Sequence, residues 1–282
     1  MEPPEKPEDS EGLGFLYTIL IAFVFAVFLF FILTKIKAER FIRLWFFIVT
    51  TIAISLTLNV ILFKLNPNIS SLGFAGFTAL VIAFPLAYFK IFKRNLLVHN
   101  LTELMIYPGI AAVFVPILGM LGIIILLLAI SLYDMWAVWK SEFMEKMAKY
   151  QINHLKFFTG FFVPYADKKQ RKKLNLLKQK YQGKSEKIKE KAFKKANIKV
   201  NLAILGGGDI IFPIITAGVV YKVYMNTAGT LGGILPALII SASATIGILS
   251  LFMMAKKKKY YPAMPFITIA MYLGMIINWI VF

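Results

Sequence analysis

The feature that most constrains this fold is a series of long apolar runs that recurs along the whole chain. A helical run of about 20 apolar residues crosses the hydrocarbon core of a bilayer, which is about 30 Å thick. Eight segments have this character, and we expect each to be a transmembrane helix: 13–33, 41–63, 72–92, 101–118, 121–139, 200–220, 231–254 and 262–282. The sequence therefore predicts an all-α polytopic membrane protein with the lipid bilayer as its solvent.

The basic residues predict how these helices are oriented. The formal net charge is +18, but Lys and Arg are concentrated in the links between apolar runs. With the N-terminus outside the cytosol, 29 of the 32 basic residues fall on the cytosolic face, leaving Lys6, Lys64 and Lys222 on the other. This distribution follows the positive-inside rule and argues against a nucleic-acid partner. We expect a multi-pass protein of the cell membrane, with both termini extracytosolic and the loop 140–199 cytosolic.

Composition divides the chain into four parts. Residues 1–12 are acidic and proline-rich, unlike the basic start of a secretory signal. The apolar stretch 157–166 is too short to span, so we expect it at the membrane interface or re-entering the membrane. Residues 167–199 are rich in lysine and predict a flexible linker or a surface helix. The expected parts are an extracytosolic tail (1–12), five transmembrane helices (13–140), a basic cytosolic loop (141–199) and three transmembrane helices (200–282).

Two aspartates are predicted to lie inside the membrane. Asp134 lies six residues before Lys140, and Asp209 lies ten residues after Lys199. Because their segments run in opposite directions, both acids would lie in the cytosolic half and could face each other. An aspartate at such depth costs on the order of 2.5–3.5 kcal/mol, so it points to a function, although a structural polar pair is the alternative. A third acid, Glu103, is near enough to the cytosolic end of its segment to snorkel or to pair with a lysine.

Short motifs surround these aspartates and open the last apolar segment. Glycines weaken a helix and permit close approach by a neighbouring helix or an extended substrate. Prolines in the first turn of a helix are tolerated there. The three motifs are Tyr133-Asp134, Gly206-Gly207-Gly208-Asp209 and Pro262-Ala263-Met264-Pro265.

In this order the motifs resemble the YD, GxGD and PAL motifs of the presenilin and signal peptide peptidase family of intramembrane aspartyl proteases. The stretches 131–140 and 205–213 resemble the archaeal members, and the resemblance covers roughly residues 95–282. It implies that Asp134 and Asp209 are the catalytic pair and that the other motif residues support the active site. The family usually has nine spans, so eight spans imply the presenilin fold with its first helix absent. Met264 replaces the leucine of the PAL motif, a swap that keeps size and apolarity.

The chemistry implied by this resemblance needs no metal or cofactor. Two close carboxyls in a low dielectric share one proton, so one can act as a base on water while the other acts as an acid. The substrates would be transmembrane polypeptides, and by resemblance to presenilin their N-termini would lie outside. A substrate helix must unwind locally, and the glycines or the stretch 157–166 could pair with the opened strand.

Other functions are open on the sequence alone. A proton- or cation-coupled transporter or channel would also place acids in the membrane. A prepilin-type peptidase carries a GxGD motif but lacks the proline motif, and an inert scaffold would use the acids structurally. The chain has no cysteine, which excludes a thiol nucleophile. Its two histidines, His99 and His154, are far apart and are expected at the interface, which argues against a zinc or serine–histidine protease.

Overall fold

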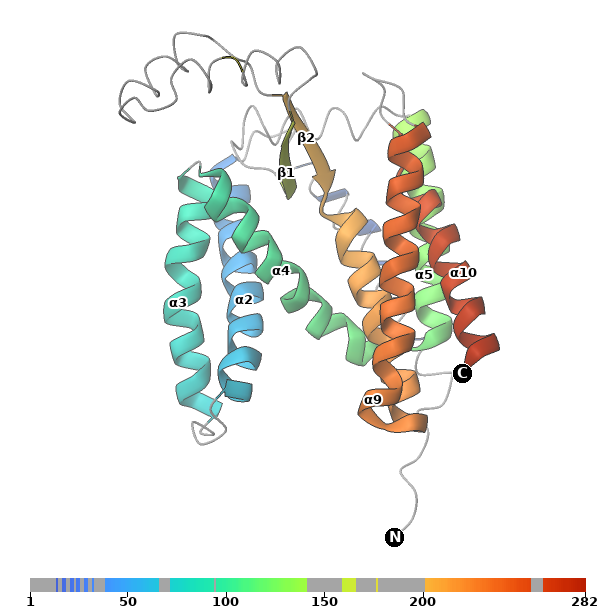
Figure 1. Cartoon of the computed structure of the whole chain (residues 1–282). Coiled ribbons are helices and arrows are strands. Elements are labelled where there is room, and N and C mark those ends of the chain that lie inside the picture. Colours follow the sequence, from blue (N-terminus) through green and yellow to red (C-terminus); the bar gives the residue numbers. More distant parts are fainter. Residues whose placement is uncertain are drawn as a thin grey trace. The chain divides into compact units, whose positions relative to one another are not determined.

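The computed structural model describes residues 39–65, 72–93, 95–140, 159–165, 201–254 and 261–282, together with isolated positions between 14 and 32 and residue 176. The elements, drawn in Figure 1, are α2 (Glu39–Leu65), α3 (Leu72–Phe92), α4 (Leu96–Ile117), α5 (Met120–Trp139), β1 (Gly160–Tyr165), β2 (Asn201–Gly206), α9 (Gly208–Met254) and α10 (Met264–Val281). They belong to two compact units, residues 1–159 with 207–282, and residues 160–206.

The predicted class, an all-α polytopic membrane protein, is confirmed. In the described part of the chain, six helices are long and apolar enough to cross a membrane. Two of them form α9, which breaks at Gly229, where a φ of 74° is a conformation that glycine adopts at little cost. The expected span 72–92 contains the shorter apolar helix Gly76–Phe92. The span 13–33 lies mostly outside the described residues, so the number eight stays a prediction.

In the first unit, α4 contacts helices on both of its sides. It packs against α2 and α3, and also against α9, which in turn contacts α5 and α10. A Cβ on Gly109 of α4 would lie 2.7 Å from the carbonyl carbon of Ala53 in α2, and a Cβ on Gly218 of α9 would lie 2.5 Å from Val115 in α4. Small residues let helix backbones approach this closely, which is how helices associate in lipid.

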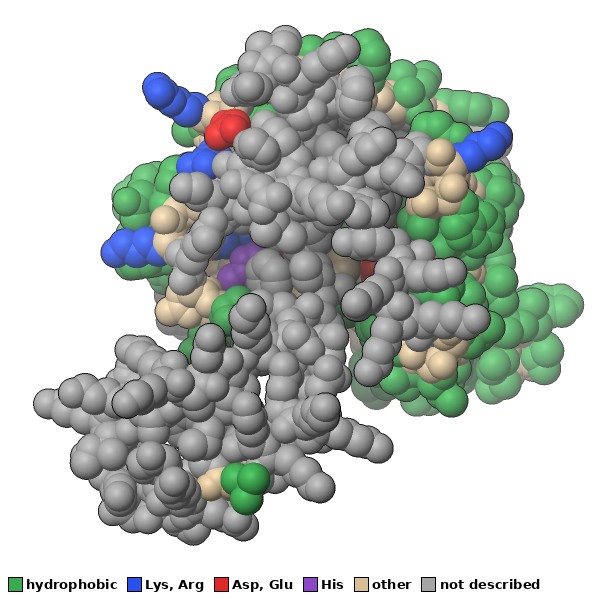
Figure 2. Space-filling model, turned by 90° about the horizontal axis from the view of Figure 1, so that it is seen from above, with side chains coloured by type: hydrophobic (Ala, Val, Ile, Leu, Met, Phe, Trp, Pro, Cys, Tyr) green, Lys and Arg blue, Asp and Glu red, His purple; other side chains and the backbone are tan. Residues whose placement is uncertain are grey.

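A buried apolar cluster lies where α5, α9 and α10 meet. Its fully buried members include Ile123 and Leu127 from α5, Val219 from α9, and Ile267 and Met271 from α10. The flanks of these helices carry large exposed apolar side chains, which Figure 2 shows around the sides of the helices. Side chains of this kind face lipid in a membrane protein, so the exposed apolar surface agrees with the predicted solvent.

The second unit contains a two-stranded antiparallel sheet. Its register pairs Gly160 with Gly206 at one end and Tyr165 with Asn201 at the other. One prediction is therefore wrong in detail, because the expected helix 200–220 begins only at Gly208, after strand β2. The stretch 157–166 contains strand β1, and its place at the membrane interface or re-entering the membrane stays a prediction.

The three consecutive glycines give a physical reason for this difference. Each costs about 1 kcal/mol in a helix interior relative to alanine, so a helix starts more favourably at the last of them, Gly208, than through all three. The backbone groups of residues 201–206 pair instead with those of β1. The periodicity of a six-residue apolar run does not distinguish a strand from part of a buried helix, which is why the sequence predicted a helix over residues 201–206.

Candidate active site

Asp134 is buried in α5 and held by the start of α10. Asp134 is only 5% exposed. Its Oδ2 accepts a hydrogen bond from the amide N–H of Met264 at 3.0 Å. The neighbouring amide of Ala263 lies close enough to favour the same carboxyl. The Tyr133-Asp134 motif and the Pro262–Pro265 motif, distant in the sequence, therefore meet at one carboxyl group.

The proline motif supplies this donor because of where α10 begins. Ala263 is the N-cap residue and Met264 the first helical residue, so the Met264 amide has no acceptor within its own helix. Pro265 follows in the first turn, where its missing N–H costs nothing. Pro262 and Met264 are both buried. The motif thus places the backbone amide of Met264 where it donates to Asp134.

Substitutions of Met264 test whether its packing holds that donor in place. Met264 is 4% exposed and belongs to the α5–α9–α10 cluster. Met264→Leu keeps the volume and is expected to cost less than about 1.5 kcal/mol of stability, whereas Met264→Ala should cost about 2–5 kcal/mol. We expect Met264→Ala to lower both the melting temperature and proteolysis, with Met264→Leu close to wild type. Equal behaviour of the two variants in thermal melts and cleavage assays would contradict this account.

Asp209 lies in the first turn of α9 and is half-buried. The turn before it is fixed by backbone bonds. The Gly207 amide donates to the Thr159 carbonyl at 3.3 Å, and the Gly207 carbonyl accepts from the amides of Ile210 and Ile211 at 3.2 and 3.0 Å. Asp209 is therefore presented at a helix start, and not in the middle of a transmembrane helix as the sequence suggested.

The glycines before Asp209 have different surroundings. A Cβ on Gly207 would lie 3.3 Å from the Tyr107 hydroxyl and 3.4 Å from the Thr159 carbonyl oxygen, which is tight packing. A Cβ on Gly208 would meet Phe212 at 3.7 Å, an ordinary contact, and Gly208 is exposed. Gly206 is the last residue of β2 and belongs to the second unit. Gly207 is thus confined by its neighbours, whereas Gly208 leaves open backbone beside Asp209.

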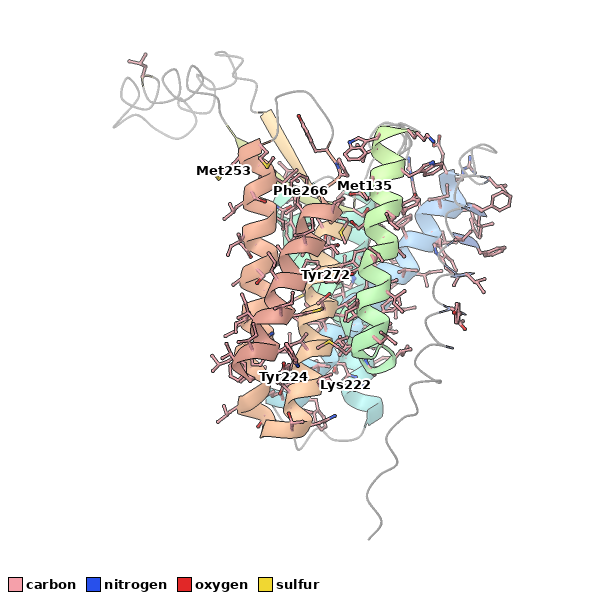
Figure 3. The ribbon with its side chains drawn as sticks, turned by 90° about the vertical axis from the view of Figure 1, so that its right-hand side faces the viewer. Met135, Lys222, Tyr224, Met253, Phe266 and Tyr272 are labelled. Atoms are coloured by element: carbon pink, nitrogen blue, oxygen red, sulfur yellow. The ribbon has the colours of Figure 1, made fainter. Side chains whose placement is uncertain are left out.

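Both aspartates lie toward the same end of the first unit. Figure 3 shows Met135, the neighbour of Asp134 in sequence, at the same end as Phe266 and opposite Lys222. Asp209 is 13 residues before Lys222 on α9, about 20 Å at the rise of a helix. The helices that carry the two aspartates, α5 and α9, contact each other and both contact α10. This arrangement agrees with the expectation that both acids lie in one half of the membrane.

Tyr133 has a different environment from Asp134. It is half-buried, and its ring packs on that of Trp136 with centroids 6.3 Å apart. Trp136 is exposed. The expected support of the active site by Tyr133 stays a prediction.

The sequence analysis missed a buried polar group on α3 and α4. Glu103 pairs with Lys90, which confirms one of the two expectations for this acid. Lys90, which was counted among the cytosolic basic residues, is only 6% exposed. His99 is also buried within the protein, which the sequence analysis did not predict, and its expected place at the membrane interface stays a prediction. The four-residue spacing of His99, Glu103 and Tyr107 was the available signal, because it places them on one helix face.

Comparison with known protein families decides between the open functions. Residues 2–282 match the family model described as signal-peptide peptidase, presenilin aspartyl protease. The chain belongs to this family. The matched range contains the residues of all three motifs and extends over the N-terminal segments, which the motif resemblance did not cover. No curated protein and no solved structure matches the chain. Membership of the presenilin and signal-peptide peptidase family makes the chain an intramembrane aspartyl protease that acts on transmembrane substrates, and the transporter and prepilin-peptidase alternatives are not favoured.

Proposed function

We propose that Asp134 and Asp209 are the catalytic pair and that they hydrolyse peptide bonds within the transmembrane segments of membrane-protein substrates. The observation that carries this proposal is the hydrogen bond from the Met264 amide to Asp134, which joins two of the three family motifs at one buried carboxyl. Asp209, from the remaining motif, opens a helix that contacts both α5 and α10.

In the proposed reaction the two carboxyls share one proton. The ionised aspartate takes a proton from water as the water oxygen bonds to the scissile carbonyl carbon, and the protonated aspartate donates to the carbonyl oxygen. The carbon–nitrogen bond then breaks as the newly protonated aspartate donates its proton to the leaving amine, while the other, now ionised, takes a hydroxyl proton of the intermediate and restores the starting state. We assign neither part to a particular aspartate, because a coupled pair titrates as a unit. The Met264 amide keeps the Asp134 carboxyl in one orientation through these steps.

The remaining motif residues have supporting roles in this proposal. Gly208 is exposed and lacks a side chain, so an unwound substrate strand can approach the backbone next to Asp209. Gly206 ends β2 three residues before Asp209 in the chain. A two-stranded sheet has outer edges, and an extended peptide can add to such an edge by main-chain hydrogen bonds. Tyr133, Gly207 and residues 262–265 shape the site around the two carboxyls.

We further propose that the protein lies in the cell membrane with the loop 140–199 in the cytosol. This rests on the distribution of Lys and Arg, since 29 of 32 fall on the face assigned to the cytosol. Because an extended strand pairs with a sheet edge in a fixed direction, we expect substrates of one polarity only. By resemblance to presenilin, these would be helices whose N-termini lie outside.

Thiol labelling in intact cells tests this orientation. The natural sequence has no cysteine, so one cysteine placed within 170–195 is the only thiol. We expect a membrane-impermeant reagent to leave it unlabelled until the membrane is opened. A cysteine at position 6, on the predicted outer face, serves as the control and should label at once. Rapid labelling within 170–195 in sealed cells would reverse the topology and the expected polarity of the substrates.

A pair of test peptides checks the substrate class. The two peptides share one transmembrane segment and differ in which end carries the basic residues, so they insert with opposite polarity. With the protein in sealed vesicles of known orientation, cleavage is expected for the peptide whose N-terminus lies on the extracytosolic side. Cleavage of both at equal rates would contradict the proposed polarity but not the proposed catalytic pair.

A further inference from the structure

A buried charged cluster on α3 and α4 has no part in the proposed reaction. The side chains of Lys90 and Glu103 form an ion pair, and each is only 2% exposed. His99 Nε2 lies 3.6 Å from the same carboxylate oxygen of Glu103. Burying two charges away from water costs several kcal/mol per ion before their attraction is counted, so such a pair is weak evidence for stability alone.

Tyr107 connects this cluster to the turn that carries Asp209. His99, Glu103 and Tyr107 are spaced four residues apart on α4 and therefore share one face of the helix. The buried Tyr107 hydroxyl lies beside the Glu103 carboxylate, at the limit of hydrogen-bond geometry. The same hydroxyl would lie 3.3 Å from a Cβ on Gly207. A continuous set of contacts thus runs from Lys90 through Glu103 and Tyr107 to the start of α9.

We propose that Glu103 and Tyr107 are positioning residues that set the place of Asp209 for catalysis. Lys90 fixes the Glu103 carboxylate, which in the active protein accepts a hydrogen bond from the Tyr107 hydroxyl and thereby fixes the tyrosine ring against Gly207. Gly207 begins the turn whose next helical residues include Asp209. This inference rests on the proposed catalytic role of Asp209. The competing explanation is that the ion pair only joins α3 to α4.

A matched pair of double variants separates the two explanations. Lys90→Met with Glu103→Gln and Lys90→Met with Glu103→Leu both remove the two buried charges. They differ in whether an oxygen remains to accept the Tyr107 hydroxyl. Replacing both partners of a buried pair avoids leaving one charge uncompensated, so both variants are expected to fold. Tyr107→Phe is the third variant, and it removes only the hydroxyl.

We expect the leucine double variant and Tyr107→Phe each to lower kcat by roughly five- to tenfold with little change in KM. One lost hydrogen bond is worth about 1 kcal/mol, and about 1.4 kcal/mol corresponds to tenfold in rate. The glutamine double variant should recover most of this loss. Adding Tyr107→Phe to the leucine double variant should cause little further loss, because both changes remove the same interaction.

Several outcomes would overturn the inference. If the two double variants share one kcat, or if kcat follows the melting temperature instead of the presence of the acceptor, the cluster is only structural. Tyr107→Phe decides the matter even where a double variant fails to purify, since it keeps the ring and its packing. Asp209→Asn separates the two proposals. An inactive Asp209→Asn beside a fully active Tyr107→Phe defeats this inference alone, whereas an active Asp209→Asn defeats the proposed function.

Discussion

Replacing either Asp134 or Asp209 by asparagine is expected to abolish proteolysis. General acid–base catalysis contributes about 10²–10⁴ in rate, and an amide cannot exchange the proton that the mechanism moves. Because the two carboxyls act as one unit, each single variant should lose about as much as the variant that lacks both. The measurement is single-turnover cleavage of a transmembrane test peptide by purified protein.

The structure supplies a control for the Asp134 variant. Asparagine keeps a side-chain oxygen that can accept the Met264 amide, so the contact between α5 and α10 is expected to persist. Asp134→Leu lacks that acceptor and should lose stability as well as activity, since it leaves a buried amide without its partner. Thermal melts of the two variants distinguish loss of chemistry from loss of fold. Substantial cleavage by either asparagine variant would mean that the pair is not the catalyst.

Deleting strand β1, Gly160–Tyr165, is expected to have the second largest effect. The deletion removes every pairing partner of β2 in the recorded register, from Gly206 to Asn201. A strand without its ladder leaves backbone donors and acceptors unsatisfied wherever water is excluded. Gly206 is followed directly by Gly207, Gly208 and Asp209. We therefore expect proteolysis to fall below detection while the helices of the first unit remain folded.

A deletion elsewhere in the same loop is the matched control. Residues 170–195 are rich in lysine and poor in large apolar side chains, so we expect them to contribute little to the packed core. Removing most of them should leave the activity of the purified protein within about twofold of wild type, because surface changes of this kind usually cost less than about 0.5 kcal/mol. Loss of activity on this deletion, with β1 dispensable, would reverse the assignment of the two parts of the loop.

Much of the fold was predictable because membrane spans depend on local composition. The apolar runs located the helices, and α5, expected at 121–139, is observed at Met120–Trp139. Asp134 and Asp209 were also predictable, since an acid in an apolar run is costly wherever its partners lie. The order of the three short motifs then indicated the family without any tertiary information.

The features that the sequence did not predict all depend on contacts between distant segments. The pairing of β1 with β2 joins strands separated by a long loop, and a short apolar run has no periodicity that reveals its partner. The hydrogen bond from the Met264 amide to Asp134 joins residues 130 positions apart in the sequence. Lys90 is buried because α3 contacts α4. Basic residues follow it closely in the sequence, which predicted an exposed cytosolic link instead. Local patterns locate helices, but tertiary packing decides which polar groups meet.

The most direct test of the central claim is the mass of the products formed in isotopically labelled water. The purified protein, reconstituted in vesicles, is given a test peptide that contains a single transmembrane segment in water enriched in oxygen-18. The account predicts cleavage inside that segment, with one heavy oxygen in the new carboxyl group, and no product from Asp134→Asn or Asp209→Asn. An intact peptide in the presence of folded wild-type protein would contradict it, and aspartate-dependent ion flux in those vesicles would favour transport.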